Sequence, residues 1–224
     1  MYGRPPGRNR QVPAWSLLAD GEANLSGNAK VEESMDRRAV RTRTALIEAF
    51  NHLALSHRKN IRVADIVALA NVGRSTFYEH YRSADDIHLQ AMTRPFAFLA
   101  DAAAGIGDEP RLTSLLRHFW ENRQLARSSF TGRMHGKVTR LLAGMIEERL
   151  QGEAEALSIP LRLAALQLAD TALTPVRFWV MAEAACTPEA LAGAICRCGA
   201  AMRAALTSGG ARAVCDPTES NRPL

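Results

Sequence analysis

The sequence predicts an all-α protein, with an N-terminal three-helix domain of helix-turn-helix type followed by a C-terminal helical bundle, about nine helices in total. Two observations support this fold class. Strand-favouring residues do not gather into alternating runs, whereas Ala, Leu, Arg and Glu are abundant. Residues 61–81 also contain two short helical segments joined by a three-residue turn with a glycine. In such a unit the second helix can enter a DNA major groove.

Composition and charge agree with a globular protein that meets an anionic partner. The chain has 224 residues, of which 47% are hydrophobic and 23% charged, enough for one large core or two smaller ones. Its formal net charge is +5, and residues 36–82 contain nine basic side chains against four acidic ones. Because this excess coincides with the helix-turn-helix pattern, it predicts contact with DNA phosphates.

The chain divides into four predicted segments. Residues 1–35 are rich in Pro, Gly, Asn and charge and have no helical period, so we expect a flexible basic arm there. A helix-turn-helix domain is expected over 36–95, with Asp36 as the N-cap of its first helix. A second helical domain should cover 96–207, and 208–224 should be a disordered tail.

The first three helices are predicted from their apolar residues. The first helix should end near Ser56. Its apolar residues recur at the spacing of one helix face, at Leu46, Ile47, Phe50, Leu53 and Ala54. A polar loop over 57–60 should lead to a second helix that buries Ile66. Val72 in the turn and Phe77 on the third helix complete the expected core.

A fourth helix should begin at Ser83, because Asp86 stands three residues later in the pattern of a capping box. Pro95 should either kink or end this helix, since proline lacks the amide hydrogen and clashes with the preceding turn. The glycines and proline of 105–110 mark a break, so the functional boundary is placed between Pro95 and Gly107.

The remaining helices are expected near 110–127, 133–152, 160–185 and 188–207. The last one has a strong start signal, with a capping hydroxyl at Thr187, proline at the first helical position and an acid after it. Its apolar stripe is Leu191, Ile195, Cys198, Met202 and Leu206. This stripe is either part of the chain's own core or, because small residues flank it, a dimer face.

At this point the residues resemble a known family. Ala-Phe at 49–50, Ile66, Val72 and above all Thr-Phe-Tyr-Glu-His-Tyr at 76–81 make the segment 43–87 similar to the DNA-binding domain of TetR-family transcriptional regulators. The resemblance implies DNA contacts from Arg41, Arg43, Arg62, Arg74, Ser75, Thr76, Tyr78 and His80.

The resemblance also assigns roles on the third helix. Arg74 opens that helix and should read a guanine, whereas Thr76, Tyr78 and His80 should hold phosphates and sugars. Three positions depart from the family pattern. Arg62 stands where a capping Thr is common, Gly73 where Ser is common, and Ala84 replaces a lysine that commonly grips the DNA backbone.

The C-terminal domain should bind an effector and form a dimer if the resemblance holds. An apolar effector pocket could be lined by Phe119, Trp120, Phe178, Trp179 and Met181, although these residues could equally fill the core. The expected function is that of a ligand-responsive homodimeric repressor on a near-palindromic operator, with double-stranded DNA and a small apolar effector as partners. The alternative is an apolar-ligand-binding protein of this fold with weak or lost DNA binding.

Other classes of function have little support in the sequence. No nucleophile and base arrangement stands out, His118 and His135 lack metal-ligand spacing, and the four cysteines match no zinc pattern. We therefore expect no enzyme activity, no metal and no cofactor. No signal peptide and no run of about 18 apolar residues is present, so a cytoplasmic protein without a membrane span is expected.

Overall fold

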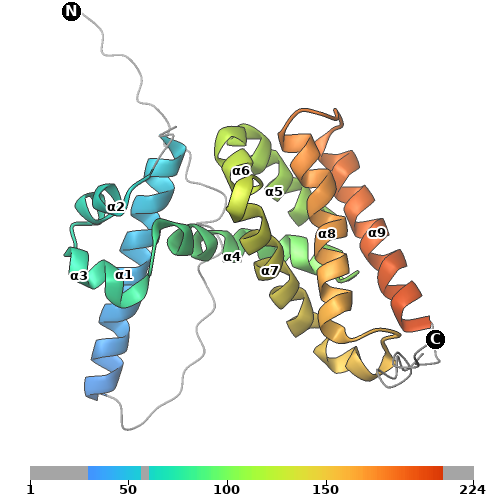
Figure 1. The fold of residues 1–224 in the computed structure, drawn as a ribbon, viewed down its shortest axis with the longest axis horizontal. Coiled ribbons are helices and arrows are strands. Elements are labelled where there is room, and N and C mark those ends of the chain that lie inside the picture. The colour runs from blue at the N-terminus through green and yellow to red at the C-terminus, as the bar shows by residue number, and fades with distance from the viewer. Residues whose placement is uncertain (1–29, 57–60, 209–224) are drawn as a thin grey trace, which may run out of the picture. The chain divides into compact units, whose positions relative to one another are not determined.

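The computed structural model describes residues 30–56 and 61–208. Over these ranges the chain forms nine α-helices, one 3-10 helix and no strand, which confirms the predicted all-α class (Figure 1). The helices are α1 (Lys30–Leu55), α2 (Val63–Ala70), α3 (Arg74–His80), α4 (Ala84–Ala103), α5 (Glu109–Glu121), α6 (Arg123–Ser129), α7 (Gly132–Leu150), η2 (Gln151–Ala156), α8 (Leu161–Val180) and α9 (Pro188–Ser208). Most of the predicted arm, the loop 57–60 and the tail from 209 lie outside the described residues.

Helix α1 begins earlier than the sequence indicated. The prediction that Asp36 caps this helix is wrong, because the helix starts at Lys30 and Asp36 lies inside it. Residues 30–36 contain neither glycine nor proline, so nothing in the backbone interrupts the helix there. The predicted arm therefore loses residues 30–35 to α1, whereas the end of α1 at Leu55 agrees with the expected end near Ser56.

Internal contacts divide the chain into two units, residues 1–40 and 41–224. Buried apolar side chains form two clusters, and both lie within the second unit. The first cluster, called the recognition core here, joins α1, α2, α3 and the start of α4. It includes the predicted inward residues Leu46, Phe50, Leu53, Ala54, Ile66, Phe77 and Ile87. The second cluster, the bundle core, runs from Met92 on α4 to Leu206 on α9.

Helix α4 belongs to both clusters, with Ile87 in the recognition core and Met92 in the bundle core. It continues through Pro95 to Ala103, so Pro95 does not end it. Whether the proline bends α4 stays a prediction.

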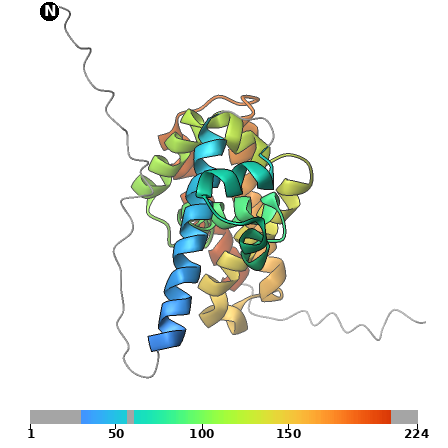
Figure 2. The ribbon, with the colours of Figure 1, turned by 90° about the vertical axis from the view of Figure 1, so that its left-hand side faces the viewer.

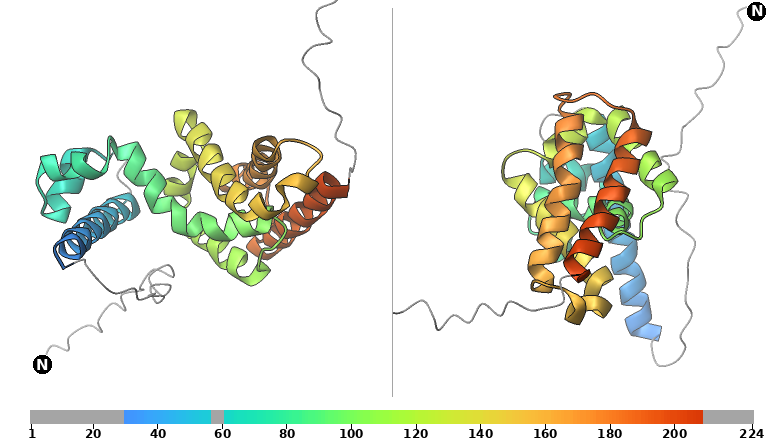
Figure 3. Two further views of the ribbon diagram at one scale, coloured as in Figure 1. Left: turned by 90° about the horizontal axis from the view of Figure 1, so that it is seen from below. Right: turned by 90° about the vertical axis from the view of Figure 1, so that its right-hand side faces the viewer.

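The bundle contains one more helix than the sequence predicted. The segment expected as one helix over 110–127 is divided at Asn122, whose φ of −107° and ψ of 38° leave the helical region. The carbonyl of His118 accepts both the backbone amide and the side-chain amide of Asn122, each at 3.0 Å. Helices α7, α8 and α9 lie side by side in that order (Figures 1 and 3).

Helix α8 also ends earlier than expected, at Val180 rather than near 185. Ala182 follows it with a φ of 61°, a left-handed conformation that a helix cannot continue. The start of α9 is confirmed, because the hydroxyl of Thr187 accepts the amide hydrogen of Ala190 at 3.2 Å and Pro188 opens the helix.

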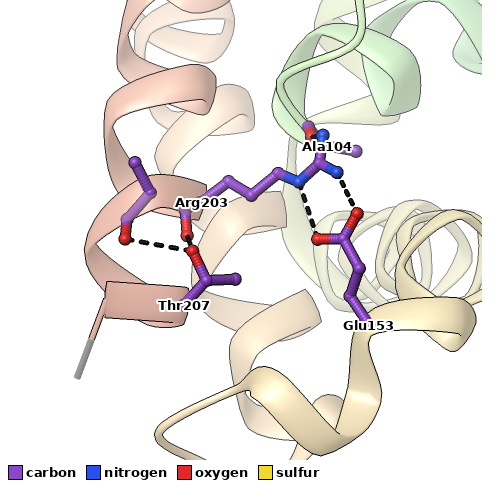
Figure 4. Close-up of polar contacts among 5 residues, drawn as sticks. Ala104, Glu153, Arg203 and Thr207 are labelled. Atoms are coloured by element: carbon purple, nitrogen blue, oxygen red, sulfur yellow. Dashed lines mark hydrogen bonds and ion pairs between the residues drawn. The ribbon is translucent and has the colours of Figure 1, made fainter. Parts of the chain in front are cut away.

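Two arginines of the bundle hold the C-terminal end of α4. Arg203 on α9 donates to both carboxylate oxygens of Glu153, with Nε 3.0 Å from Oε2, and its Nη1 donates to the carbonyl of Ala104 at 3.3 Å (Figure 4). Arg149 on α7 pairs with Asp101 and donates from Nη2 to an α4 carbonyl. Arg203 thus satisfies a carbonyl at the end of α4, whereas Arg149 binds the last turns of the helix from the side.

Helix α9 also approaches the end of α4 very closely. A Cβ atom added at Gly199 would lie 2.1 Å from the carbonyl oxygen of Ala102 and 2.9 Å from that of Ala103. Only a residue without a side chain allows the two helices this spacing. The end of α4 is therefore fixed both by hydrogen bonds and by packing.

Candidate nucleic-acid interface

The turn between α2 and α3 sets the position of α3 (Figure 2). Asn71 ends α2 in the left-handed conformation with a φ of 52°. Its amide donates to the carbonyl of Ala68 at 3.4 Å, and the amide of Val72 donates to that of Val67 at 3.1 Å. This pair of bonds is a Schellman motif, which terminates a helix and reverses the chain sharply.

Replacement of Asn71 tests whether the left-handed backbone conformation at this position determines the stability of the turn. Asn71→Ala should lower the free energy of unfolding by about 1 kcal/mol, because alanine tolerates the left-handed region poorly. Asn71→Gly should leave it within about 0.5 kcal/mol of wild type, since glycine adopts this conformation freely. Chemical unfolding of both variants, followed by circular dichroism, provides the comparison. Equal losses from both substitutions would contradict the backbone explanation.

Helix α3 has one buried side and one open side. Phe77 is fully buried in the recognition core, and Tyr81 after the helix is buried beside it. The ring of Tyr78 meets Phe77 edge-on, with centroids 5.4 Å apart and an angle of 88° between the planes. Tyr78 is nevertheless 51% exposed, so its hydroxyl stays on the solvent side.

The predicted contact residues of α3 lie away from its buried side. Arg74, Ser75 and Tyr78 are exposed, and Thr76 and His80 are half-buried. The structure thus brings these five residues together on one short helix. Their contacts with DNA stay a prediction.

The other predicted contacts are basic residues near α3 in sequence. Arg41 and Arg43 are exposed on α1. The side chain of Arg62 is 76% exposed at the start of α2, with its Nε 3.6 Å from a carboxylate oxygen of Asp65. An ion pair this exposed contributes little to stability and leaves the guanidinium accessible to solvent.

Two departures from the family pattern concern helix caps. No side-chain hydrogen bond caps α3, because its N-cap is Gly73. The side chain of Arg62 accepts no amide hydrogen from α2 either, but the amide of Arg62 donates to the carboxylate of Asp65 at 3.1 Å. Helix α2 therefore keeps half of a capping box, whereas α3 starts without a side-chain cap.

The start of α4 is capped as predicted. The hydroxyl of Ser83 accepts the amide hydrogen of Asp86 at 3.3 Å. The reciprocal bond goes to Arg82 rather than to Ser83, since the carboxylate of Asp86 accepts the Arg82 amide at 3.1 Å. Ala84, which replaces the common lysine, is half-buried and packs against the recognition core.

One residue that the sequence did not single out lies beside this core. The ring of His88 on α4 lies 5.1 Å from that of Phe50, and its Nε2 lies 2.9 Å from the hydroxyl of Ser129 on α6. Burial lowers the pKa of His88 to about 4, so the ring is neutral at neutral pH. A histidine directly after the apolar Ile87 was the available signal, but nothing in the sequence pairs residues 88 and 129.

The five predicted effector-pocket residues differ in how exposed they are. Phe119 and Trp179 are buried, Met181 is half-buried, and Trp120 and Phe178 are 41% and 37% exposed. The rings of Trp120 and Trp179 stack with centroids 4.9 Å apart, and the guanidinium of Arg123 lies 4.8 Å from the Trp120 ring. Their role in binding an effector stays a prediction.

A small apolar cavity of about 130 Å³ lies elsewhere, between α8, α9 and the end of α4. Its lining includes Leu168, Pro175, Ile195 and Cys198 and none of the five predicted pocket residues. Pockets that bury a drug-sized ligand usually measure about 300–1,000 Å³. This cavity is therefore too small for such a molecule.

The residues of the predicted dimer stripe on α9 also differ in exposure. Leu191, Ile195 and Leu206 are buried in the chain's own bundle core, which was the alternative reading of the stripe. Cys198 is exposed and Met202 half-buried, so these two remain accessible to a partner. The dimer face as a whole stays a prediction.

Comparisons with known proteins bear on the class of protein. No family model matches the chain. It is 34% identical over 79 residues to an uncharacterised HTH-type transcriptional regulator, YxbF of Bacillus subtilis, a match that covers 34% of this chain and 21% of that protein. The chain thus spans about a fifth of the curated relative's length.

Solved structures similar to this chain include a TetR transcriptional regulator from Streptococcus agalactiae. It is 25% identical, with a TM-score of 0.44, and the match covers 75% of this chain and 98% of that one. Another is RolR in complex with resorcinol, 22% identical, with a TM-score of 0.47 over 78% of this chain and 96% of that one.

The geometry of α2, the turn and α3 defines a helix-turn-helix protein. Within that class, the Thr-Phe-Tyr-Glu-His-Tyr segment at 76–81 resembles the TetR family, and 79 residues of the chain are similar to an HTH-type transcriptional regulator.

Two further observations concern the described part of the chain. None of its helices is long and apolar enough to cross a membrane. Over the same residues, no group of three or more His, Cys, Asp or Glu side chains is placed to hold a metal ion.

Proposed function

We propose that the protein is a DNA-binding transcriptional regulator that reads its operator with α3. The observation that carries this proposal is the two-sided character of that helix, with Phe77 fully buried and Arg74 and Tyr78 exposed. The N-terminal end of a recognition helix reaches base edges, and Arg74 stands at that end. A bidentate guanidinium contact would let it read a guanine.

The finer parts of the proposal concern assembly and control. The regulator acts as a cytoplasmic homodimer, with a DNA-binding domain over 36–95 and an effector and dimerisation domain over 96–207. Two copies of α3 enter successive major grooves of a near-palindromic operator, about 34–36 Å apart. A small apolar effector releases the repressor by favouring a state in which α4 holds these helices at another spacing.

Removal of one hydroxyl from α3 tests its phosphate contacts. Tyr78→Phe should weaken binding by about 0.5–1.5 kcal/mol on every sequence, because it removes a hydrogen bond to phosphate and keeps the ring that rests on Phe77. Fluorescence anisotropy with several duplexes measures the loss. Tyr81→Phe is the matched control, because the Tyr81 hydroxyl is buried and cannot reach DNA. A loss confined to one sequence would contradict the assigned role.

The missing side-chain cap of α3 and the absence of lysine at Ala84 favour one other function, that of an apolar-ligand-binding protein with weak or lost DNA binding. A gel-shift assay with the DNA upstream of its own coding sequence separates the two. A regulator retards this DNA with an affinity that falls steeply with salt, since bound phosphates release counterions. A ligand carrier leaves the DNA unshifted at every salt concentration.

A further inference from the structure

The short helix α6 lies against both cores. Its residue Leu125 packs against the recognition core, whereas Ala126 and the following Phe130 belong to the bundle core. One turn after Leu125, Ser129 is buried, and its hydroxyl lies 2.9 Å from Nε2 of His88. Helix α6 therefore contacts the recognition core through a packed leucine and reaches His88 beside it through a partly buried hydrogen bond.

His88 connects this hydrogen bond to α1. It follows Ile87, a fully buried member of the recognition core, and its ring lies 5.1 Å from Phe50 on α1. A displacement of Ser129 must therefore break this hydrogen bond or move a ring that packs on the recognition core. Breaking it costs Nε2 of the half-buried His88 this hydrogen bond, whereas the Ser129 hydroxyl keeps its bond to the Leu125 carbonyl.

Helix α6 is also hydrogen-bonded to the C-terminal end of α8. Arg127 donates from Nε to the carbonyl of Val180 at 3.0 Å and from Nη2 to that of Met181 at 2.8 Å. The last carbonyls of a helix have no partner within the helix, so one side chain of α6 satisfies two acceptors at the end of α8. That end carries Trp179 and Met181, two of the predicted effector-pocket residues.

Another polar contact joins the first turn of α4 to the bundle and is more exposed. Lys137 on α7 pairs with Asp85 at 2.8 Å, but the two side chains are 34% and 46% exposed. Solvent screens an exposed pair, which therefore contributes little to holding the two helices together. The contact of His88 with the buried Ser129 is therefore less exposed to solvent than this ion pair.

We infer that α6 couples the C-terminal end of α8 to the recognition core, with Arg127 and Ser129 as the two positioning residues. This inference rests on the proposed function, since it names how the bundle controls DNA binding. Coupling between two sites is reciprocal, so DNA bound to α3 must also alter the end of α8. That consequence can be measured without knowing the effector.

Hydrogen-deuterium exchange of the full-length protein provides the test, with and without a duplex selected from random DNA. In wild type, DNA should slow exchange over 61–81 and also change it over 123–129 and 176–182. Ser129→Ala and Arg127→Gln should bind the duplex and keep the protection of 61–81 but lose most of the change over 176–182. Ser128→Ala is the matched control, because Ser128 is exposed and its hydroxyl bonds only within α6. It should respond as wild type does.

The outcomes separate the inference from the proposed function. Wild-type protein that shows no protection of 61–81 with any selected duplex would contradict DNA binding itself and the inference with it. Protection of 61–81 without any change over 176–182 in wild type would overturn the inference alone. A full change over 176–182 in both Ser129→Ala and Arg127→Gln would overturn it equally.

Discussion

Gly199→Ala is expected to lower the free energy of unfolding by about 3 kcal/mol, near the upper end of the cost of overpacking a core. Helix propensity alone predicts the opposite, a gain of up to about 1 kcal/mol, because alanine is the best helix former. Packing decides the sign, since the new Cβ would lie 2.1 Å from the backbone oxygen of Ala102. Backbone atoms in two packed helices cannot move aside as a flexible side chain can.

Equilibrium unfolding in denaturant measures this loss as a lower midpoint at an unchanged slope. Gly144→Ala is the matched control, because Gly144 lies inside α7 and a Cβ there would meet nothing within 4 Å. This control should be stabilised by about 0.5–1 kcal/mol. A gain of stability in both variants would contradict the close packing of Gly199 on α9 against α4.

Arg74→Ala is expected to relax base preference at one operator position in each half-site and to cost about 1–3 kcal/mol there. The loss should be selective, because a bidentate contact distinguishes guanine from other bases by two acceptors in the major groove. Duplexes that vary one base pair at a time, measured by fluorescence anisotropy, give the profile of the variant.

A second arginine gives the control for charge. Arg41→Ala also removes one positive charge, but from α1, and should weaken binding evenly and reduce the salt slope by about one. An Arg74→Ala profile with the same base preferences as wild type would exclude Arg74 as the residue that reads bases.

Much of this architecture could be predicted from local sequence patterns. The recognition core follows from helical spacing, since Phe50, Ile66 and Phe77 occupy the buried positions that their periodicity indicates. Helix starts were predictable where capping chemistry is explicit, as at Ser83 and Thr187. These signals lie within a few residues of one another, so no knowledge of tertiary contacts is needed.

The errors arose where several weak signals compete. Asp36 is a good capping residue, yet the helix-forming residues before it extend α1 to Lys30. Asn122 is an ordinary polar residue in a helical pattern, and no local signal marks the change of its backbone angles that divides the helix there. Local propensity is a weak guide in both places because neighbouring structure overrides it.

The features of the candidate site that depend on distant residues could not be predicted at all. His88 and Ser129 are 41 positions apart, and their hydrogen bond depends on how α4 and α6 pack. The close approach at Gly199 likewise depends on the position of Ala102 in another helix. Contacts between segments far apart in the sequence have no local pattern.

Selection of bound duplexes from random DNA, followed by sequencing, tests the central proposal most directly. If α3 reads an operator as part of a homodimer, the selected duplexes should share two inverted half-sites whose centres lie about one helical turn, or a whole number of turns, apart. Arg74→Ala should select the same arrangement with one less defined position in each half. Recovery of no shared sequence by the wild-type protein would contradict the account.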